Sequence, residues 1–247
     1  AYNAKFKDIS FKGNDGIVIG QHTGLNSDIA YYKTRDNGIN WYGATSTLYN
    51  FSNAANSGLP GLFDHATPVD ANSVHVFNSR KFICVGADQS IVYGDIAAST
   101  NLINPNKNGL TIAGLAANAK LNAVTFVDDL WGYIGGDNGV FLKTTGVNKA
   151  DESLSYNTVQ WGAANCSLST NSGTGCNIPS ASDINVSVVR FSSRFDGFIA
   201  GKTVAISCSS TPKYAVLLHD ESNLFSSRFW YDKLGRLVLS QNSKQHK

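Results

Sequence analysis

Charged side chains and long apolar runs are both scarce in this chain of 247 residues. Only 15% of the residues are charged and the formal net charge is +2, whereas about 25% is typical of globular domains. The charges form no basic run, which argues against a nucleic-acid groove or an anionic membrane surface as partner. The longest apolar stretches have about five residues, and a membrane-spanning helix needs roughly 20. The sequence therefore predicts neither nucleic-acid binding nor a membrane span.

Methionine is absent altogether. Soon after Ala1, Ile9 and Phe11 already alternate with polar residues in the manner of a β-strand. A charged segment followed by an apolar one, as in a signal peptide, does not precede them. We therefore expect either that the chain is cut from a longer protein or that a signal peptide was removed.

Cysteine is rare, with four residues at positions 84, 166, 176 and 208. Cys166 and Cys176 bracket a polar segment, and we predict a disulfide between them. A zinc site would favour closer cysteine pairs or neighbouring histidines, but the histidines are scattered. A disulfide indicates an oxidising compartment, so we expect a secreted or bacterial cell-surface protein. No metal and no cofactor is expected.

One strand–turn–strand motif recurs along the chain. Residues 124–136 align without a gap on residues 189–201. A third copy, with a deletion, occupies residues 9–20, and a degenerate fourth copy occupies residues 74–86. Each version ends in a glycine, namely Gly20, Gly86, Gly136 and Gly201. Together with 25 Asn and 23 Gly, this repeat is typical of a turn-rich, all-β chain.

Further strands follow the repeat. A polar turn and another apolar stretch come after Gly86 and Gly136, and a tryptophan of a possible fourth strand follows at Trp41, Trp161 and Trp230. Four antiparallel strands per unit, repeated around an axis, predict a β-propeller with at least four visible blades, whole or part of a larger one. A two-sheet sandwich is the alternative, but it does not explain four copies of one motif.

The segment 34–41 reads Thr-Arg-Asp-Asn-Gly-Ile-Asn-Trp. It resembles the Asp-box, the bacterial neuraminidase repeat, and matches that pattern at Thr34, Asp36, Gly38 and Trp41. We expect Asp36 to accept backbone hydrogen bonds within a turn, Gly38 to adopt a positive φ, and Trp41 to pack back between sheets. The resemblance implies a structural role, because the box lies away from the catalytic centre of sialidases.

The segment 132–145 looks like the repeat of the photosystem-assembly-factor type of seven-bladed propeller. Sialidase chemistry, by contrast, needs three clustered arginines, a tyrosine nucleophile with a glutamate partner, and an acid. Only Arg190 lies in an expected inner strand, and the paired acids at 128–129 and 151–152 fall in expected turns. We therefore expect no catalytic residues and no enzymatic activity.

The segment 229–245 resembles the YD repeat of rearrangement-hotspot (RHS) proteins, with its core at Tyr231, Asp232, Gly235 and Arg236. Locally it reads as a hairpin turn followed by a returning strand, and an ordinary hairpin closing the domain remains the alternative. In that family, strings of such hairpins build a large hollow β-shell.

These observations predict an Asp-box-type propeller over residues 1–228 and a YD-like hairpin over 229–247 that leads into a longer parent. The expected function is a non-catalytic structural and binding module of a large secreted or cell-surface bacterial protein. Expected partners are other domains of the parent, a secretion apparatus or surface protein, or a glycan. The alternatives are a sialidase-type exo-glycosidase and a propeller chaperone for the assembly of a membrane complex.

Overall fold

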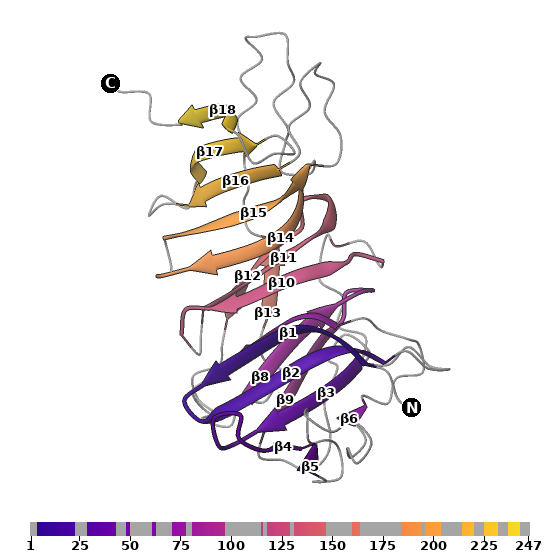
Figure 1. The fold of residues 1–247 in the computed structure, drawn as a ribbon. Helices are drawn as coiled ribbons and strands as arrows, with labels where there is room; N and C mark the ends of the chain where they lie inside the picture. The colour runs from indigo at the N-terminus through magenta and orange to yellow at the C-terminus, as the bar shows by residue number, and fades with distance from the viewer. Residues whose placement is uncertain are drawn as a thin grey trace. The chain divides into compact units, whose positions relative to one another are not determined.

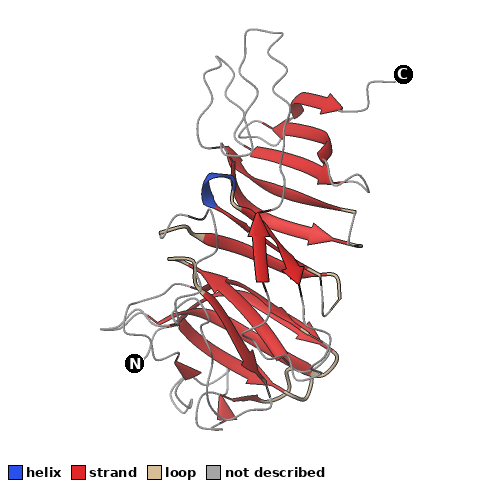
Figure 2. Ribbon diagram, turned by 180° about the vertical axis from the view of Figure 1, so that it is seen from behind, coloured by secondary structure: helices blue, strands red, loops and turns tan. Residues whose placement is uncertain are grey.

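The computed structural model describes much of the chain, and nearly every described element is a strand (Figure 2). The described residues are 4–22, 29–42, 48–49, 61–62, 71–77, 81–96, 115, 118–128, 131–146, 160–163, 184–193, 196–203, 214–219, 225–231 and 237–242. Among them, the one helical element is a short 3-10 turn, Asp137–Gly139.

The strands form four antiparallel sheets, which we call blades 1 to 4, and the main path through each sheet follows chain order (Figure 1). Blade 1 consists of β1 (Ala4–Lys12), β2 (Asp15–His22), β3 (Ile29–Thr34), β4 (Trp41–Tyr42), β5 (Leu48–Tyr49) and β6 (Gly61–Leu62), which pairs with β3. Blade 2 consists of β7 (Ala71–Val76), β8 (Lys81–Gly86) and β9 (Ile91–Asp95).

Blades 3 and 4 complete the described chain. Blade 3 consists of β10 (Leu121–Phe126), β11 (Gly132–Gly136), β12 (Phe141–Gly146) and β13 (Gln160–Ala163). Blade 4 consists of β14 (Ile184–Phe191), β15 (Gly197–Thr203), β16 (Tyr214–His219), β17 (Phe225–Tyr231) and β18 (Leu237–Asn242). The protein is all-β, and its sheets are the sequential antiparallel meanders of β-propeller blades.

The chain divides into two compact units, which we describe separately. Unit 1 comprises Ala1–Thr111, Ala116–Val124 and Asn148–Val159. Unit 2 comprises Ile112–Leu115, Thr125–Val147 and Gln160–Lys247. The expected domain boundary after residue 228 falls inside β17, which pairs with both β16 and β18. The division into 1–228 and 229–247 therefore stays a prediction.

The strand–turn–strand repeat corresponds to the first two strands of every blade. Residues 9–20 lie in β1 and β2, 74–86 in β7 and β8, 124–136 in β10 and β11, and 189–201 in β14 and β15. The three repeated tryptophans also share a place: Trp41 lies in β4, Trp161 in β13 and Trp230 in β17, each the fourth strand of its sheet. The number of strands per blade, however, varies from three to six.

The closing glycines face an irregularity in the first strand. The register of β1 shifts between Phe6 and Asp8, and Gly20 pairs with Phe6 at that shift. A Cβ atom on Gly20 would lie 2.1 Å from the backbone oxygen of Lys5. Gly201 stands in the same relation to β14, where a Cβ atom would lie 2.1 Å from the backbone oxygen of Asn185. Glycine is required at this strand end because backbone atoms approach it closely.

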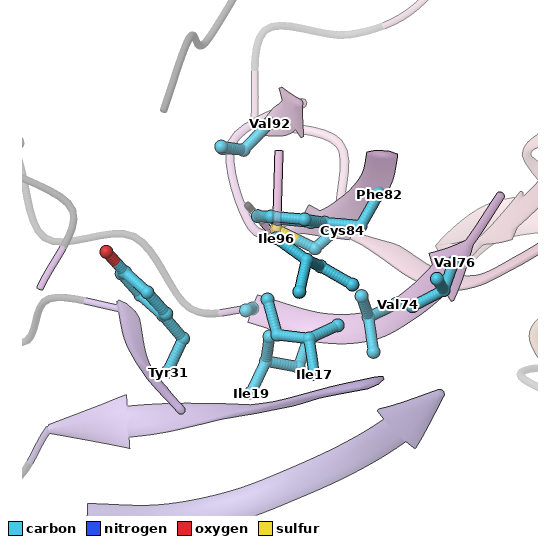
Figure 3. Close-up of a cluster of buried hydrophobic side chains, with 10 residues drawn as sticks. Ile17, Ile19, Tyr31, Val74, Val76, Phe82, Cys84, Val92 and Ile96 are labelled. Carbon is cyan, nitrogen blue, oxygen red and sulfur yellow. The ribbon is translucent and has the colours of Figure 1, made fainter. Parts of the chain in front are cut away.

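In unit 1, the core lies between blades 1 and 2. Alternate residues of β2 point to opposite faces, so that Ile17 and Ile19 face Val74 and Val76 of β7 (Figure 3). The complete cluster is Ile17, Ile19, Tyr31, Ala71, Val74, Val76, Phe82, Cys84, Val92 and Ile96. Val18 points the other way and joins a second buried group with Tyr32 and Trp41.

In unit 2, aromatic rings do the corresponding packing. Tyr133 of β11 stacks on Phe191 of β14, with ring centroids 3.8 Å apart and planes 11° from parallel. Next to them, a Cβ atom on Gly135 would lie 2.3 Å from a methyl group of Val186 and 2.7 Å from one of Val189. Val189 and Phe191 of β14 thus face β11 of the neighbouring blade.

Candidate functional site

The segment matching the Asp-box forms the turn between β3 and β4. Thr34 is the last residue of β3 and is fully buried, and Trp41 is the first residue of β4. Between them, Asn37 and Gly38 adopt φ values of 57° and 84°. Gly38 has the positive φ that its role in the turn requires, and asparagine is among the residues that tolerate this region best.

The carboxylate of Asp36 holds this turn together. Its Oδ1 accepts hydrogen bonds from the backbone N of Asn40 and from the hydroxyl of Thr34, both at 2.8 Å. Its Oδ2 accepts one from Asn40 Nδ2 at 2.6 Å. Thr34 Oγ1 in turn accepts the backbone N–H of Gly38 at 3.0 Å. The two side chains thus satisfy polar groups of a loop that lies between two strands.

These contacts set the acidity of Asp36. The hydrogen bond from the backbone of Asn40 is the main reason that the pKa of the carboxyl lies below its ordinary value, and the side chains of Asn40 and Thr34 add to it. Donors that point at a carboxylate favour its charged form. Asp36 is therefore an ionised turn-holding group, and this environment is the opposite of what a general acid needs.

Trp41 closes the turn on its inner side. Its indole Nε1 donates a hydrogen bond to the backbone oxygen of Gly38 at 3.0 Å. The ring is buried and meets Phe11 of β1 edge-on, with centroids 5.8 Å apart. Burying the ring while its N–H keeps a partner is the favourable arrangement for tryptophan.

A second carboxylate, which the sequence did not single out, links blades within unit 1. Asp8 Oδ2 accepts hydrogen bonds from Ser73 Oγ at 2.8 Å and from the backbone N of Val74 at 2.9 Å. Ser73 Oγ itself accepts the backbone N–H of Val124 at 3.2 Å. Asp8 and Ser73 each stand one position before the aligned residues Ile9 and Val74. A polar residue at the position before the first aligned residue of a repeat is therefore the sequence signal that could have identified Asp8 and Ser73.

A parallel link runs through the neighbouring bulge positions. Lys7 Nζ donates to Asn72 Oδ1 at 3.1 Å, and Asn72 Nδ2 donates to the backbone oxygen of Leu121 at 2.8 Å. Side chains of β1 and β7 therefore cross-link blades 1 and 2 and the start of β10. These polar residues serve the assembly of blades.

Arg190 and the described acidic turn residues also make local contacts. Arg190 is exposed on β14, and its Nη1 donates to the backbone oxygen of Val189 at 2.8 Å. Asp128 Oδ1 accepts the backbone N–H of Trp131 at 2.8 Å. Asp196 Oδ2 accepts the hydroxyl of Ser193 at 3.0 Å. Each acid thus stabilises its own turn.

Several predicted site residues lie outside the described part of the chain. They are Cys166 and Cys176 of the expected disulfide, and Asp232, Gly235 and Arg236 of the YD-like segment. Tyr231 ends β17 and pairs with Leu237 of β18. Cys84 is a free, buried thiol, and burial raises its pKa. The disulfide and the YD repeat therefore stay predictions.

Within the described ranges, no group of three or more His, Cys, Asp or Glu side chains is placed to hold a metal ion. In the same residues, no helix is long and apolar enough to cross a bilayer. Among the described residues of unit 1, the Asp36 carboxylate fixes a turn and the Asp8 carboxylate joins neighbouring blades.

No family model and no curated protein matches this sequence. Among solved structures, it is similar to YCF48 bound to a D1 peptide, with 13% identity and a TM-score of 0.38 over 88% of this chain and 77% of that one. It is also similar to YCF48 from Cyanidioschyzon merolae, with 11% identity and a TM-score of 0.36 over 83% of this chain and 79% of that one.

Proposed function

We propose that this chain is a non-catalytic structural and protein-binding propeller module of a large secreted or cell-surface bacterial protein. The observation that carries the proposal is that the carboxylates of Asp36 and Asp8 are both engaged in structural hydrogen bonds. Asp36 is held by donors of its own turn and Asp8 by donors of the next blade. Glycoside hydrolysis needs two carboxyl groups flanking one bond, with one of them able to donate a proton. Neither aspartate is in such a setting.

Binding of a partner does not require a pair of catalytic carboxyl groups. A β-sheet that presents loops and exposed side chains offers a surface on which a partner can be recognised. Ile39, at the tip of the turn held by Asp36, is 80% exposed and has a fixed backbone on both sides. An apolar side chain held at a rigid loop tip suits a protein partner better than a sugar. A glycan remains the second ligand class to test.

The parent protein is the remaining part of the proposal. Tyr231 and Leu237 are paired at the end of the β17–β18 hairpin, and the YD-like residues Asp232, Gly235 and Arg236 lie between or beside them in sequence. A YD repeat is itself a strand pair of this kind. We therefore propose that further hairpins of the same type follow in the parent.

The activity part is tested with a panel of fluorogenic glycosides, including sialosides, and the purified chain. We expect no turnover above buffer. Arg190→Ala is the matched control, because Arg190 is the one arginine in an inner strand among the described residues. Turnover that this substitution abolishes would overturn the non-catalytic proposal.

The parent is tested by reading the full-length gene. Many downstream copies of Tyr-Asp-x-x-Gly-Arg support the RHS-like parent. A reading frame that ends after one copy, or one that carries three clustered arginines upstream, contradicts it.

Binding is tested separately, by measuring retention of surface proteins on the immobilised chain and on its Ile39→Asp variant. Equal retention on the two would contradict a role for the turn that carries Ile39.

A further inference from the structure

One face of β1 is apolar and exposed. Ile9 and Phe11, which are two residues apart and share this face, are 52% and 40% exposed. Ile9 pairs with Val18 in β2, whose side chain belongs to the group with Tyr32 and Trp41 on the same side of the sheet. We call this side of blade 1, defined by Ile9 and Phe11, the leading face.

The repeat shows what covers this face in other blades. Val74 and Val76 of β7 occupy the positions of Ile9 and Phe11, and both are buried in the cluster with Ile17 and Ile19 of the preceding blade. In unit 2, Val189 and Phe191 occupy the same positions. They pack against Gly135 and Tyr133 of the preceding blade. In both described cases, the leading face is thus covered by the second strand of a neighbouring blade.

Blade 4 exposes the complementary surface. Phe198 of β15 occupies the position of Ile17 and Tyr133, the residues that cover a leading face elsewhere. It is 36% exposed, as is Val188, which pairs with Ala200 on the same side of the sheet. The exposed Arg190 pairs with Phe198 and lies on this side as well. We call this side of blade 4, defined by Val188 and Phe198, the trailing face.

We propose that the occupant of the leading face is the trailing face of a second copy of this chain. Each copy carries one surface of each kind, and the repeat already packs these two surfaces together inside the chain. An interface between unlike surfaces is head-to-tail, and it produces a closed ring or an open row of copies depending on the rotation between them. The inference does not depend on the ligand proposed above.

The first experiment measures the molar mass of the purified wild-type chain in solution over a range of concentrations, by light scattering or sedimentation. We expect self-association that grows with concentration. A wild-type chain that stays monomeric throughout overturns the proposal.

Two variants identify the surfaces. Ile9→Glu breaks the leading face and Phe198→Glu the trailing face, and each is expected to weaken self-association by about tenfold or more, because a charge at an interface core is strongly unfavourable. Asn118→Glu is the matched control, since Asn118 is exposed in the turn before β10 and belongs to neither face. Circular dichroism and thermal denaturation establish that all three variants fold.

Mixing the two variants gives the sharpest result. Ile9→Glu retains its trailing face and Phe198→Glu its leading face, so an equimolar mixture is expected to form a one-to-one complex although neither forms a homodimer. A Phe198→Glu variant that associates as well as the wild type would mean that two leading faces pair with each other, and this would overturn the head-to-tail arrangement.

Discussion

The two units solve the same packing problem with different side chains. In unit 1, Ile17 and Ile19 of β2 meet the valines of β7. In unit 2, the equivalent positions hold Tyr133 and Gly135, and the space that Gly135 leaves is occupied by Val186 and Val189. The interior is close-packed in either case, because volume removed on one side of the contact is restored on the other. The repeat therefore specifies strand positions and leaves the distribution of side-chain volume open.

The units also differ in their polar links. Unit 1 joins its blades through the Asp8 carboxylate and the Ser73 hydroxyl. Blade 4 has Val188 at the position of Asp8, and its described side-chain link to blade 3 is an exposed hydrogen bond of 3.0 Å from the backbone N of Asn138 to Asn185 Oδ1. Unit 1 should therefore depend more on polar contacts than unit 2.

The largest expected effect comes from Ile19→Ala in unit 1. The variant deletes a fully buried side chain and should lower the free energy of unfolding by about 2–5 kcal/mol through lost burial and a cavity. Chemical denaturation measures it. Ile39→Ala serves as the control for an exposed isoleucine, with a change within about 0.5 kcal/mol. Equal losses for the two variants would contradict a core formed by Ile19 of β2 and the valines of β7.

Alanine in place of Gly135, the position of unit 2 that corresponds to Ile19, tests the effect of adding volume to the contact between blades. Gly135→Ala adds a methyl group that would lie 2.3 Å from Val186, and overpacking of this kind costs about 1–3 kcal/mol. Val186→Ala in the same chain removes the obstructing atoms. The double variant should therefore lose less than the sum of the two single losses. Strictly additive losses would contradict a shared contact.

Asp8→Ala tests the polar link. It leaves the Ser73 hydroxyl and the Val74 amide without their acceptor, and we expect a loss of about 1–3 kcal/mol by chemical denaturation. Asn185→Ala in unit 2 removes an exposed hydrogen bond and should cost less than about 1 kcal/mol. A larger loss for Asn185→Ala than for Asp8→Ala would contradict the expectation that unit 1 depends more on polar contacts than unit 2.

The smallest effect concerns pH and the turn held by Asp36. Because its hydrogen bonds keep the pKa of the folded state below that of the unfolded state, its contribution to stability is present above the unfolded pKa and is lost as pH falls through the folded pKa. The stability difference between wild type and Asp36→Asn should therefore shrink from about pH 6 to about pH 2.

Asn40→Ala provides the graded control for that titration. It removes the side-chain donor to Asp36 Oδ2 and keeps the backbone donor to Oδ1. Its pH dependence should fall between those of wild type and Asp36→Asn. A difference between wild type and Asp36→Asn that stays constant with pH would mean that the carboxylate charge contributes nothing to the turn.

Much of the blade pattern was predictable from sequence because it repeats. The strand pairs, the glycine at the end of each second strand, and the fourth-strand positions of Trp41, Trp161 and Trp230 all follow from aligned residues. The turn at Thr34 and Asp36 was predictable because side chains two residues apart can hold a short loop locally. All of these features depend on contacts near in sequence.

Contacts between blades were not predictable in the same way. Asp8 reads as an ordinary polar residue of an alternating strand, and its partners stand 65 and 66 positions away. The exchange of Ile19 for Gly135 likewise makes sense only beside Val186 and Val189. Long-range partners depend on how sheets stack, and strand periodicity alone does not encode this.

The bulge opposite Gly20 also bears on folding fidelity. Shifting the β1–β2 hairpin by one residue would place Ile19 or Gln21, in place of Gly20, opposite the Lys5 carbonyl, where no side chain fits. The same slip would turn every apolar residue of the strand to the wrong face. A single glycine therefore excludes misaligned hairpins while the sheet forms, and Gly201 does the same for β14 and β15.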